Sequence, residues 1–130
     1  MPEYRVLVTG SRDWDDYAVI REEIGAVVAE RMAITASPYP LIVVVHGKAR
    51  GADMLADRAA REFGLLVEGH RADWGRHGKA AGYKRNAEMV ALGAGRCLAF
   101  YKQGAGNRGT DHCARLAEAA GIPVRRYTAP

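Results

Sequence analysis

The chain has 130 residues, enough for one domain with a hydrophobic core and too few for two. Hydrophobic residues make up 48% and charged residues 26%, which is typical of an ordinary globular protein, and no apolar run is long enough to cross a bilayer. The formal net charge is +4, and the basic residues are spread along the chain. This distribution favours a focused phosphate pocket over a nucleic-acid-binding arm, although the charge by itself permits both.

The cysteines and the first residues of the chain predict a reduced, cytoplasmic protein. No basic segment followed by an apolar stretch is present, so we expect no secretory signal and no membrane partner. Cys97 and Cys113 lie outside any metal-binding spacing, so we expect neither a metal site nor a disulfide.

Strands and helices are predicted to alternate along the whole chain. In chain order, we expect a strand at 4–9, a helix at 16–32, a strand at 41–45, a helix at 52–63, a strand at 65–69, an irregular piece at 70–78, a helix at 79–92, a strand at 96–101, a helix at 110–120 and a strand at 123–127. Residues 41–45 read LIVVV, and a β-branched run without polar alternation is typical of a strand covered on both faces of a parallel sheet.

This alternation predicts an α/β fold, a mostly parallel five-stranded sheet with helices on both faces, with residues 1–130 forming a single domain. Right-handed crossovers bring the carboxyl ends of parallel strands to one edge, and ligands bind in the crevice outside that edge. Three glycine-containing loops follow predicted strands and therefore fall on this edge. Their convergence is the strongest physical indication of a binding site.

The first of these loops begins at Gly10, which permits a tight turn. Ser11 can donate to a phosphate oxygen and Arg12 can form a bidentate pair with it, so we favour a ligand role for both. Trp14 either stacks on a base or packs in the protein, and the sequence does not decide between the two.

The second loop follows LIVVV and runs directly into a helix. Its glycines, Gly47 and Gly51, allow the backbone to approach a ligand, and Arg50 adds a planar cation that matches a phosphate. Ala52 begins the helix, whose unpaired N–H groups and positive dipole end favour an anion. The segment is therefore predicted to hold an anionic group.

Two ionisable residues flank this loop. Asp53, in the first turn of the helix, is either a capping carboxylate or a functional one that accepts from a ribose hydroxyl or acts in catalysis. His46 ends the strand, where a histidine is more often a hydrogen-bonded part of the scaffold than a general acid or base.

A third group lies on the helix predicted at 79–92. Arg85 and Met89 are four residues apart, and Asn86 is three residues from Met89, so the three share one side of the helix. If this side faces the edge of the sheet, Arg85 and Asn86 suit a nucleotide, with Arg85 on a phosphate or a ribose. A solvated face with Met89 in the core is the alternative.

The loop after the fourth strand is rich in glycine. Gly106 and Gly109 free the backbone around Asn107, and Thr110 is placed to cap the next helix and to touch a phosphate. We interpret this loop as a further part of the phosphate site.

Together these motifs resemble a known family. G-S-R-x-W, H-G-x-A-R-G-A-D, W-x-x-x-G-K-x-A-G-x-x-R-N-x-x-M and G-N-x-G-T, in this order, resemble the YspA-type, cpYpsA-related branch of the SLOG superfamily from about Val6 to Val124. The resemblance implies a Rossmann-like three-layer sandwich and a homo-oligomer. The superfamily includes the LONELY GUY phosphoribohydrolases, which cleave nucleoside monophosphates into base and ribose phosphate, the DNA-processing protein DprA, and sensor domains for nucleotide-derived signals.

Two motifs depart from those of the LONELY GUY enzymes. Where these enzymes carry P-G-G-x-G-T-x-x-E, the chain reads A-G-N-R-G-T-D-H-C, so Cys113 stands at the position of the catalytic glutamate. Where they carry R-K-x-x-M, Arg85 is kept and Asn86 replaces the lysine. An N-glycosidic hydrolase needs a carboxylate beside the cation-like sugar, and Asp53, Glu88 and Asp111 are the candidates among which the sequence does not select.

Three functions follow from these observations. The preferred one is binding of a nucleotide or nucleotide-derived phosphorylated ligand, with no cofactor required beyond a nucleotide that occupies the site. The second is an N-glycosidic hydrolase of nucleoside monophosphates in which Arg85, Asp53 and Glu88 are the catalytic candidates. The third is a DNA-binding module related to DprA, which the positive charge permits and the scarcity of aromatic residues disfavours.

Overall fold

Five strands lie parallel in one sheet in the computed structural model, which describes residues 3–130. They are β1 (Tyr4–Gly10), β2 (Ile42–His46), β3 (Leu66–Gly69), β4 (Arg96–Lys102) and β5 (Val124–Ala129). Their order across the sheet is β3-β2-β1-β4-β5, with β1 at the centre. This confirms the predicted α/β, Rossmann-like fold, and every pairing among these strands is parallel, not merely most of them.

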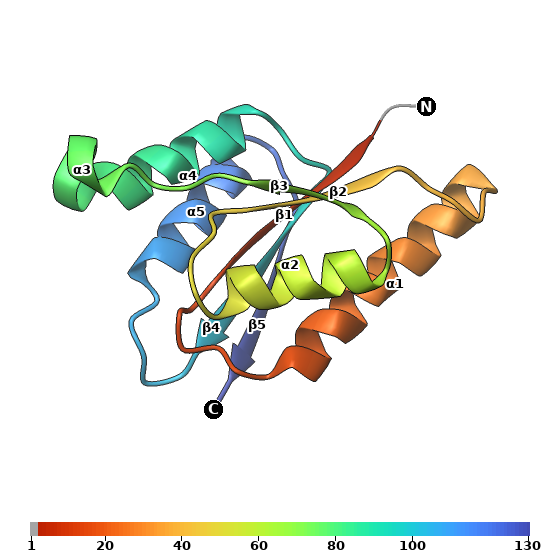
Figure 1. Cartoon of the computed structure of the whole chain (residues 1–130), viewed down its shortest axis with the longest axis horizontal. Coiled ribbons are helices and arrows are strands. Elements are labelled where there is room, and N and C mark those ends of the chain that lie inside the picture. The colour runs from red at the N-terminus through yellow and green to blue at the C-terminus, as the bar shows by residue number, and fades with distance from the viewer. Residues whose placement is uncertain (1–2) are drawn as a thin grey trace.

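The helices cover both faces of the sheet (Figure 1). They are α1 (Tyr17–Thr35), α2 (Ala52–Glu62), α3 (Trp74–His77), the 3-10 turn η1 (Gly78–Ala80), α4 (Ala81–Ala91) and α5 (Arg108–Ala119). Helices α1 and α2 pack together on one face, and α4 and α5 pack together on the other. None of the helices in the described part of the chain is both long enough and apolar enough to cross a membrane.

The core has two parts because the sheet is buried from both sides. All five residues of β2 are buried, as expected for residues 42–45 of the LIVVV run, whereas Leu41 lies before the strand and is exposed. Alternate residues of the central strands enter opposite clusters: Val6 and Val8 pack toward α1 and α2, whereas Leu7 packs toward α4 and α5. The central strands are thereby held rigidly, and they carry the loops at their carboxyl ends.

Three helix boundaries differ from the prediction by two residues or more. Helix α1 continues to Thr35 because Ala36 adopts a left-handed cap conformation with a φ of 52°, and the prolines follow only later. The predicted irregular piece contains the short helix α3, so that α4 itself begins at Ala81. Helix α5 begins at Arg108, and this places Thr110 inside the first turn and not at the cap.

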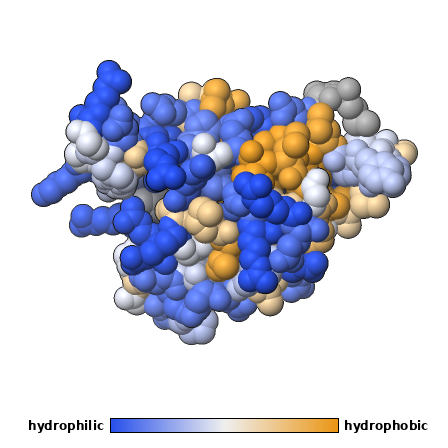
Figure 2. Space-filling view, in the orientation of Figure 1, coloured by the Kyte–Doolittle hydropathy of each residue, from blue (hydrophilic) through white to orange (hydrophobic). Residues whose placement is uncertain are grey.

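Apolar side chains gather on the surface where β2 and β3 begin (Figure 2). Leu41, immediately before β2, is 41% exposed, and Leu66, the first residue of β3, is 53% exposed. This area lies at the amino-terminal edge of the sheet. The opposite edge, where the strands end, carries a pocket.

Candidate functional site

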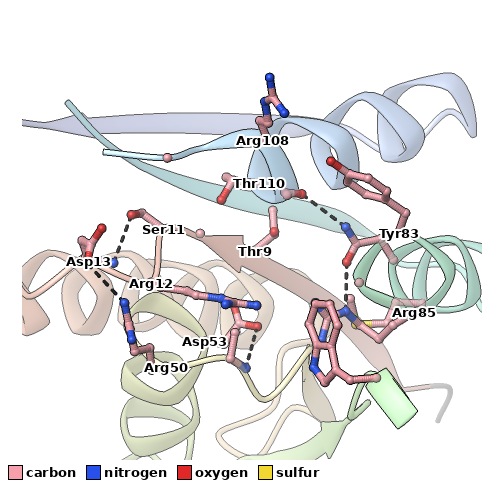
Figure 3. A pocket seen from close by; sticks show the side chains of 18 of the residues that line it. Thr9, Ser11, Arg12, Asp13, Arg50, Asp53, Tyr83, Arg85, Arg108 and Thr110 are labelled. Carbon is pink, nitrogen blue, oxygen red and sulfur yellow. Dashed lines mark hydrogen bonds and ion pairs between the residues drawn. The ribbon is translucent and has the colours of Figure 1, made fainter. Parts of the chain in front are cut away.

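A pocket of about 390 Å³ opens at the carboxyl edge of the sheet (Figure 3). It falls within the usual size range of small-molecule sites. Its lining comes from the end of β1, from three loops, from the first turns of α2 and α5, from α3 and η1, and from one side of α4. The lining residues are Thr9, Gly10, Ser11, Arg12, Asp13, Ala49, Arg50, Asp53, Trp74, Lys79, Gly82, Tyr83, Arg85, Asn86, Met89, Gly106, Arg108, Gly109 and Thr110. The structure therefore brings together most of the residues that the motifs single out.

Gly51 and Ala52, which the sequence places at the ligand, join the first two loops instead of lining the pocket. The N–H of Ala52 donates to the carbonyl of Ser11 over 3.1 Å, and the N–H of Ser11 donates to the carbonyl of Phe100 over 2.8 Å. Gly51 has a φ of +78°, and a Cβ there would lie 2.5 Å from the carbonyl oxygens of Ser11 and Arg12. Only glycine permits this close approach, so the conformation of the first loop depends on the second.

The mouth of the pocket carries exposed arginines. Arg12 and Arg50 both project from these loops, and Arg50 lies 3.7 Å from the carboxylate of Asp13 in a largely exposed ion pair. The guanidinium of Arg12 lies over the ring of Trp74 at 5.7 Å from its centroid. Exposed ion pairs contribute little to stability, so both cations are available to an anion at little cost to the fold.

Asp53 is a buried carboxylate in the wall of the pocket. Its Oδ2 accepts hydrogen bonds from the N–H groups of Gly47 at 3.0 Å and Ala49 at 3.4 Å. It therefore closes the preceding loop and does not cap its own helix. Its Oδ1 is buried and has no hydrogen-bond partner. Burial raises the pKa of the Asp53 carboxyl to about 6, against the opposing effect of these N–H groups and of Arg85 and Arg12.

Arg85 reaches across from α4 to the second loop. Its Nη1 donates to the carbonyl of Gly47 over 2.6 Å, and its Nε donates to Oδ1 of Asn86 over 3.0 Å. A Cβ on Gly47 would lie 2.6 Å from Nη1, so glycine is required for this contact. Burial lowers the pKa of Arg85 and the charge of Asp53 opposes this effect. Gly47 thus lies behind Arg85 and does not line the pocket.

Asn86 joins α4 to the start of α5. Its Nδ2 donates to the carbonyl of Gly109 over 3.2 Å and lies 3.2 Å from Nδ1 of His112. Its Oδ1 accepts from Arg85. Asn86 thus positions Arg85 and α5. It also lines the pocket, so its contact with a ligand stays a prediction.

Asn107, another predicted ligand contact, holds the fourth loop in shape. Its Oδ1 accepts from the N–H of Lys102, and its Nδ2 donates to the carbonyls of Lys102 and Ala105. Its carbonyl accepts the first intrahelical bond from Asp111, which is why α5 begins at Arg108 and Thr110 is not the cap. Gly106, Gly109 and Thr110 line the pocket as expected, whereas Asn107 supports the loop from outside it.

The candidate catalytic carboxylates are not grouped together. Glu88 is exposed on α4 and does not line the pocket, and Asp111 is held by Tyr101 and Arg115 outside it. Cys113, at the position of the family's glutamate, is fully buried against the Thr9 hydroxyl, and burial raises the pKa of its thiol to about 11. Of these groups, only Asp53 both carries a carboxylate and lines the pocket.

His46 and Trp14 belong to the scaffold. His46 is buried, its Nδ1 accepts from the N–H of Lys48, and its Nε2 lies 2.7 Å from Asp57, while burial lowers its pKa. This arrangement fits a neutral ring that donates from Nε2. Trp14 is 3% exposed and packs edge-on against Phe100 with 5.2 Å between ring centroids, so it packs in the core and does not reach a base.

The sequence motifs did not predict several of the lining residues. Thr9, Trp74, Lys79, Tyr83 and Arg108 line the pocket without having been chosen. Lys79 and Trp74 lie in the W-x-x-x-G-K motif and Arg108 lies between two glycines, so the motifs contained a signal for them. Within residues 3–130, no group of three or more His, Cys, Asp or Glu side chains is placed to hold a metal ion.

The fold and the position of the pocket define a Rossmann-like α/β protein with a small-molecule-sized cavity at the carboxyl edge of its sheet. The model of the YspA, cpYpsA-related SLOG family matches residues 4–77, more than half of the chain, and the chain belongs to this family. This confirms the resemblance of the motifs. The match includes the first two loops and Trp74, whereas α4 and the loop before α5 lie outside it.

A relative is known from a bacteriophage. The chain is 50% identical over 128 residues to the Gene 61 protein of Mycobacterium phage D29, and the aligned part covers 95% of each chain. The similarity therefore extends through α4 and α5 as well as the first half of the fold.

Proposed function

We propose that the pocket binds a nucleotide or a nucleotide-derived phosphorylated ligand. The observation that carries the proposal is the convergence of four exposed cationic side chains on one cavity. Arg12, Arg50, Lys79 and Arg108 come from four different segments and all line it. They are far apart in the sequence, and within residues 3–130 the ion pair of Arg50 with Asp13 is the one that any of them forms. Their common position therefore favours an anionic ligand.

The amino terminus of α5 adds to this anion site. Gly109 and Thr110, in its first turn, line the pocket. The first N–H groups of a helix have no intrahelical partner and carry the positive end of the dipole. Combined with the cationic side chains, they support a phosphate at this end of the pocket.

Aromatic side chains at the mouth support a base beside the phosphate. Trp74 is 50% exposed and Tyr83 is 44% exposed, and both line the pocket. Such exposed aromatic faces are suited to stacking on a planar ring. The alternation of cations and aromatic rings therefore favours a nucleotide over a simple phosphate ester.

Isothermal titration calorimetry with nucleoside mono- and diphosphates, ADP-ribose and dinucleotides tests the proposal. We expect binding of at least one of them, and we expect Arg12→Ala and Arg108→Ala each to weaken it by about tenfold or more, since each removes a charge-assisted contact. Arg115→Ala is the matched control, because Arg115 is an exposed arginine of the same helix α5 outside the pocket. No binding of any of these compounds at millimolar concentration would contradict the proposal.

A second function is favoured by one observation, the presence of Asp53 and Arg85 in the same pocket. A carboxylate beside the sugar is what hydrolysis of an N-glycosidic bond requires. If the protein is such a hydrolase, nucleoside monophosphates release free base, and Arg85→Ala abolishes the release. Intact nucleotides after long incubation at high protein concentration would rule this function out.

A further inference from the structure

One oxygen of Asp53 is held by the fold and the other is not. Oδ2 accepts from the N–H groups of Gly47 and Ala49, and this fixes the plane of the carboxylate. Oδ1 is buried and has no hydrogen-bond partner, and Asp53 as a whole has a relative exposure of only 5%. A buried polar atom without a partner is costly and rare in native proteins. Because Asp53 lines the pocket, a group that enters the pocket can supply the missing donor.

The fold offers Asp53 no neutralising ion pair. Arg12 and Arg85 both act on its charge, yet neither forms an ion pair with it within 4 Å among the described residues. Nη1 of Arg85 donates to the carbonyl of Gly47, and its Nε donates to Asn86. The carboxylate therefore lies in a cationic environment and keeps one acceptor free.

These two facts select the chemistry of the donor. An ammonium or amidinium group would bring a further positive charge close to Arg12 and Arg85, and like charges at short range in a buried site repel. A neutral hydroxyl donates a hydrogen bond without adding charge. In a phosphorylated ligand whose phosphate lies among the cations of the mouth, the sugar is the part that carries such hydroxyls.

We propose that Oδ1 of Asp53 accepts a hydrogen bond from one ribose hydroxyl of the ligand, so that the pocket discriminates against nucleotides that lack this hydroxyl. The inference rests on the proposed nucleotide binding and adds to it the recognition of the sugar. Discrimination of this kind is strong because a ligand without the hydroxyl leaves a buried acceptor unpaired.

The test compares matched ligands by calorimetry. The probes are AMP, GMP, CMP and UMP, each with its 2′-deoxy and 3′-deoxy counterpart. For the nucleotides that bind, we expect removal of one of the two hydroxyls to weaken binding to the wild-type protein by about 10- to 100-fold. The arm that loses affinity identifies the hydroxyl.

Two variants separate the role of Asp53 from a general effect of charge. In Asp53→Asn the ratio of ribo to deoxy affinity is expected to fall to within about threefold, because the charged acceptor is gone. Asp13→Asn removes a carboxylate from the mouth of the same pocket, and we expect it to change both affinities by the same factor and leave their ratio unaltered. Circular dichroism establishes that each variant is folded. Asp53→Ala serves as a second variant, in case the asparagine amide of Asp53→Asn forms a new contact with the ligand.

The outcomes distinguish the two proposals. If the 2′-deoxy and the 3′-deoxy counterparts both bind the wild-type protein as tightly as the ribonucleotide, the inference on the sugar is wrong while nucleotide binding stands. If the ratio of ribo to deoxy affinity is large in the wild type and unchanged in both Asp53 variants, another group binds the hydroxyl and the inference is again wrong. If no nucleotide binds, the proposed function fails, and the inference falls with it.

Discussion

Asp53 and Asn86 are both buried polar residues of the pocket, but the protein uses them differently. Asn86 makes hydrogen bonds inside the protein with its oxygen and with its nitrogen, so its side chain is part of the scaffold. Asp53 keeps Oδ1 without a partner. The sequence singled out both residues from their positions on helices, but only the tertiary contacts reveal which of them retains a free group.

The burial of Asp53 predicts a characteristic dependence of stability on pH. The pKa of its carboxyl rises from 3.8 to about 6 on folding, so protonation is favoured in the folded state. The contribution of the protonated Asp53 carboxyl to the free energy of unfolding is fully present below about pH 4. It is lost as the pH rises through about 6, because the buried group then becomes charged. We expect Asp53→Asn, which carries no such charge, to become more stable relative to the wild type by about 3 kcal/mol between pH 4 and pH 7.

Urea denaturation at several pH values measures this difference. Other titratable groups, among them His46, whose pKa is lowered by burial, are present in both proteins and cancel in the comparison. The control is Asp13→Asn, whose carboxylate is 56% exposed, and we expect it to change the free energy of unfolding by less than about 0.5 kcal/mol. A stability difference for Asp53→Asn that is the same at pH 4 and pH 7 would contradict the interpretation.

At the scale of elements, the site depends on how closely two loops approach each other. Gly51 combines a φ of +78° with carbonyl oxygens 2.5 Å from its missing Cβ, whereas Gly104 combines a φ of +79° with open space. The two glycines thus share a positive φ and differ in their surroundings. The glycines in the sequence predicted turns, but not which turn touches another loop, because that depends on chain segments far apart in sequence.

This pair of glycines provides a matched test. Both Gly51→Ala and Gly104→Ala place a side chain at positive φ, which costs about 1 kcal/mol. Gly51→Ala also pushes against the backbone of the first loop, so we expect it to destabilise the protein by about 2 kcal/mol more than Gly104→Ala and to reduce nucleotide affinity. Thermal and urea unfolding measure the first effect, and calorimetry the second. Equal destabilisation by the two substitutions would show that the close contact is not required.

At the scale of the whole molecule, the polar and apolar features lie at opposite edges of the sheet. The pocket and its cations occupy the carboxyl edge, and the exposed apolar side chains around Leu41 and Leu66 lie where β2 and β3 begin (Figure 2). Contiguous exposed apolar surface is often an interaction site. Self-association, which the resemblance to the family led us to expect, would bury this surface and leave the pocket open.

Sedimentation velocity tests the expectation of a homo-oligomer. We expect the wild-type protein to sediment as a dimer or larger species, and Leu66→Lys to shift it toward the monomer, because a charge in an apolar interface is costly. Met54→Lys is the control, since Met54 is similarly exposed, at 45%, but lies in the first turn of α2 near the other edge. A monomeric wild-type protein, or an unchanged Leu66→Lys, would contradict this expectation.

Local patterns in the sequence predicted the elements of the fold and the loops that meet at the pocket. Hydrophobic periodicity and the uninterrupted apolar run at residues 41–45 are local properties of the sequence. Right-handed crossovers between parallel strands then place the loops at one edge of the sheet. The tertiary structure alone decided which loop residues face the cavity: Gly47, Gly51, Ala52 and Asn107 turn out to support the site, and Trp74, not Trp14, lies at its mouth. The physical reason is that a side chain's partners come from distant segments, so neither a motif nor a period fixes which of its polar atoms remain free for a ligand.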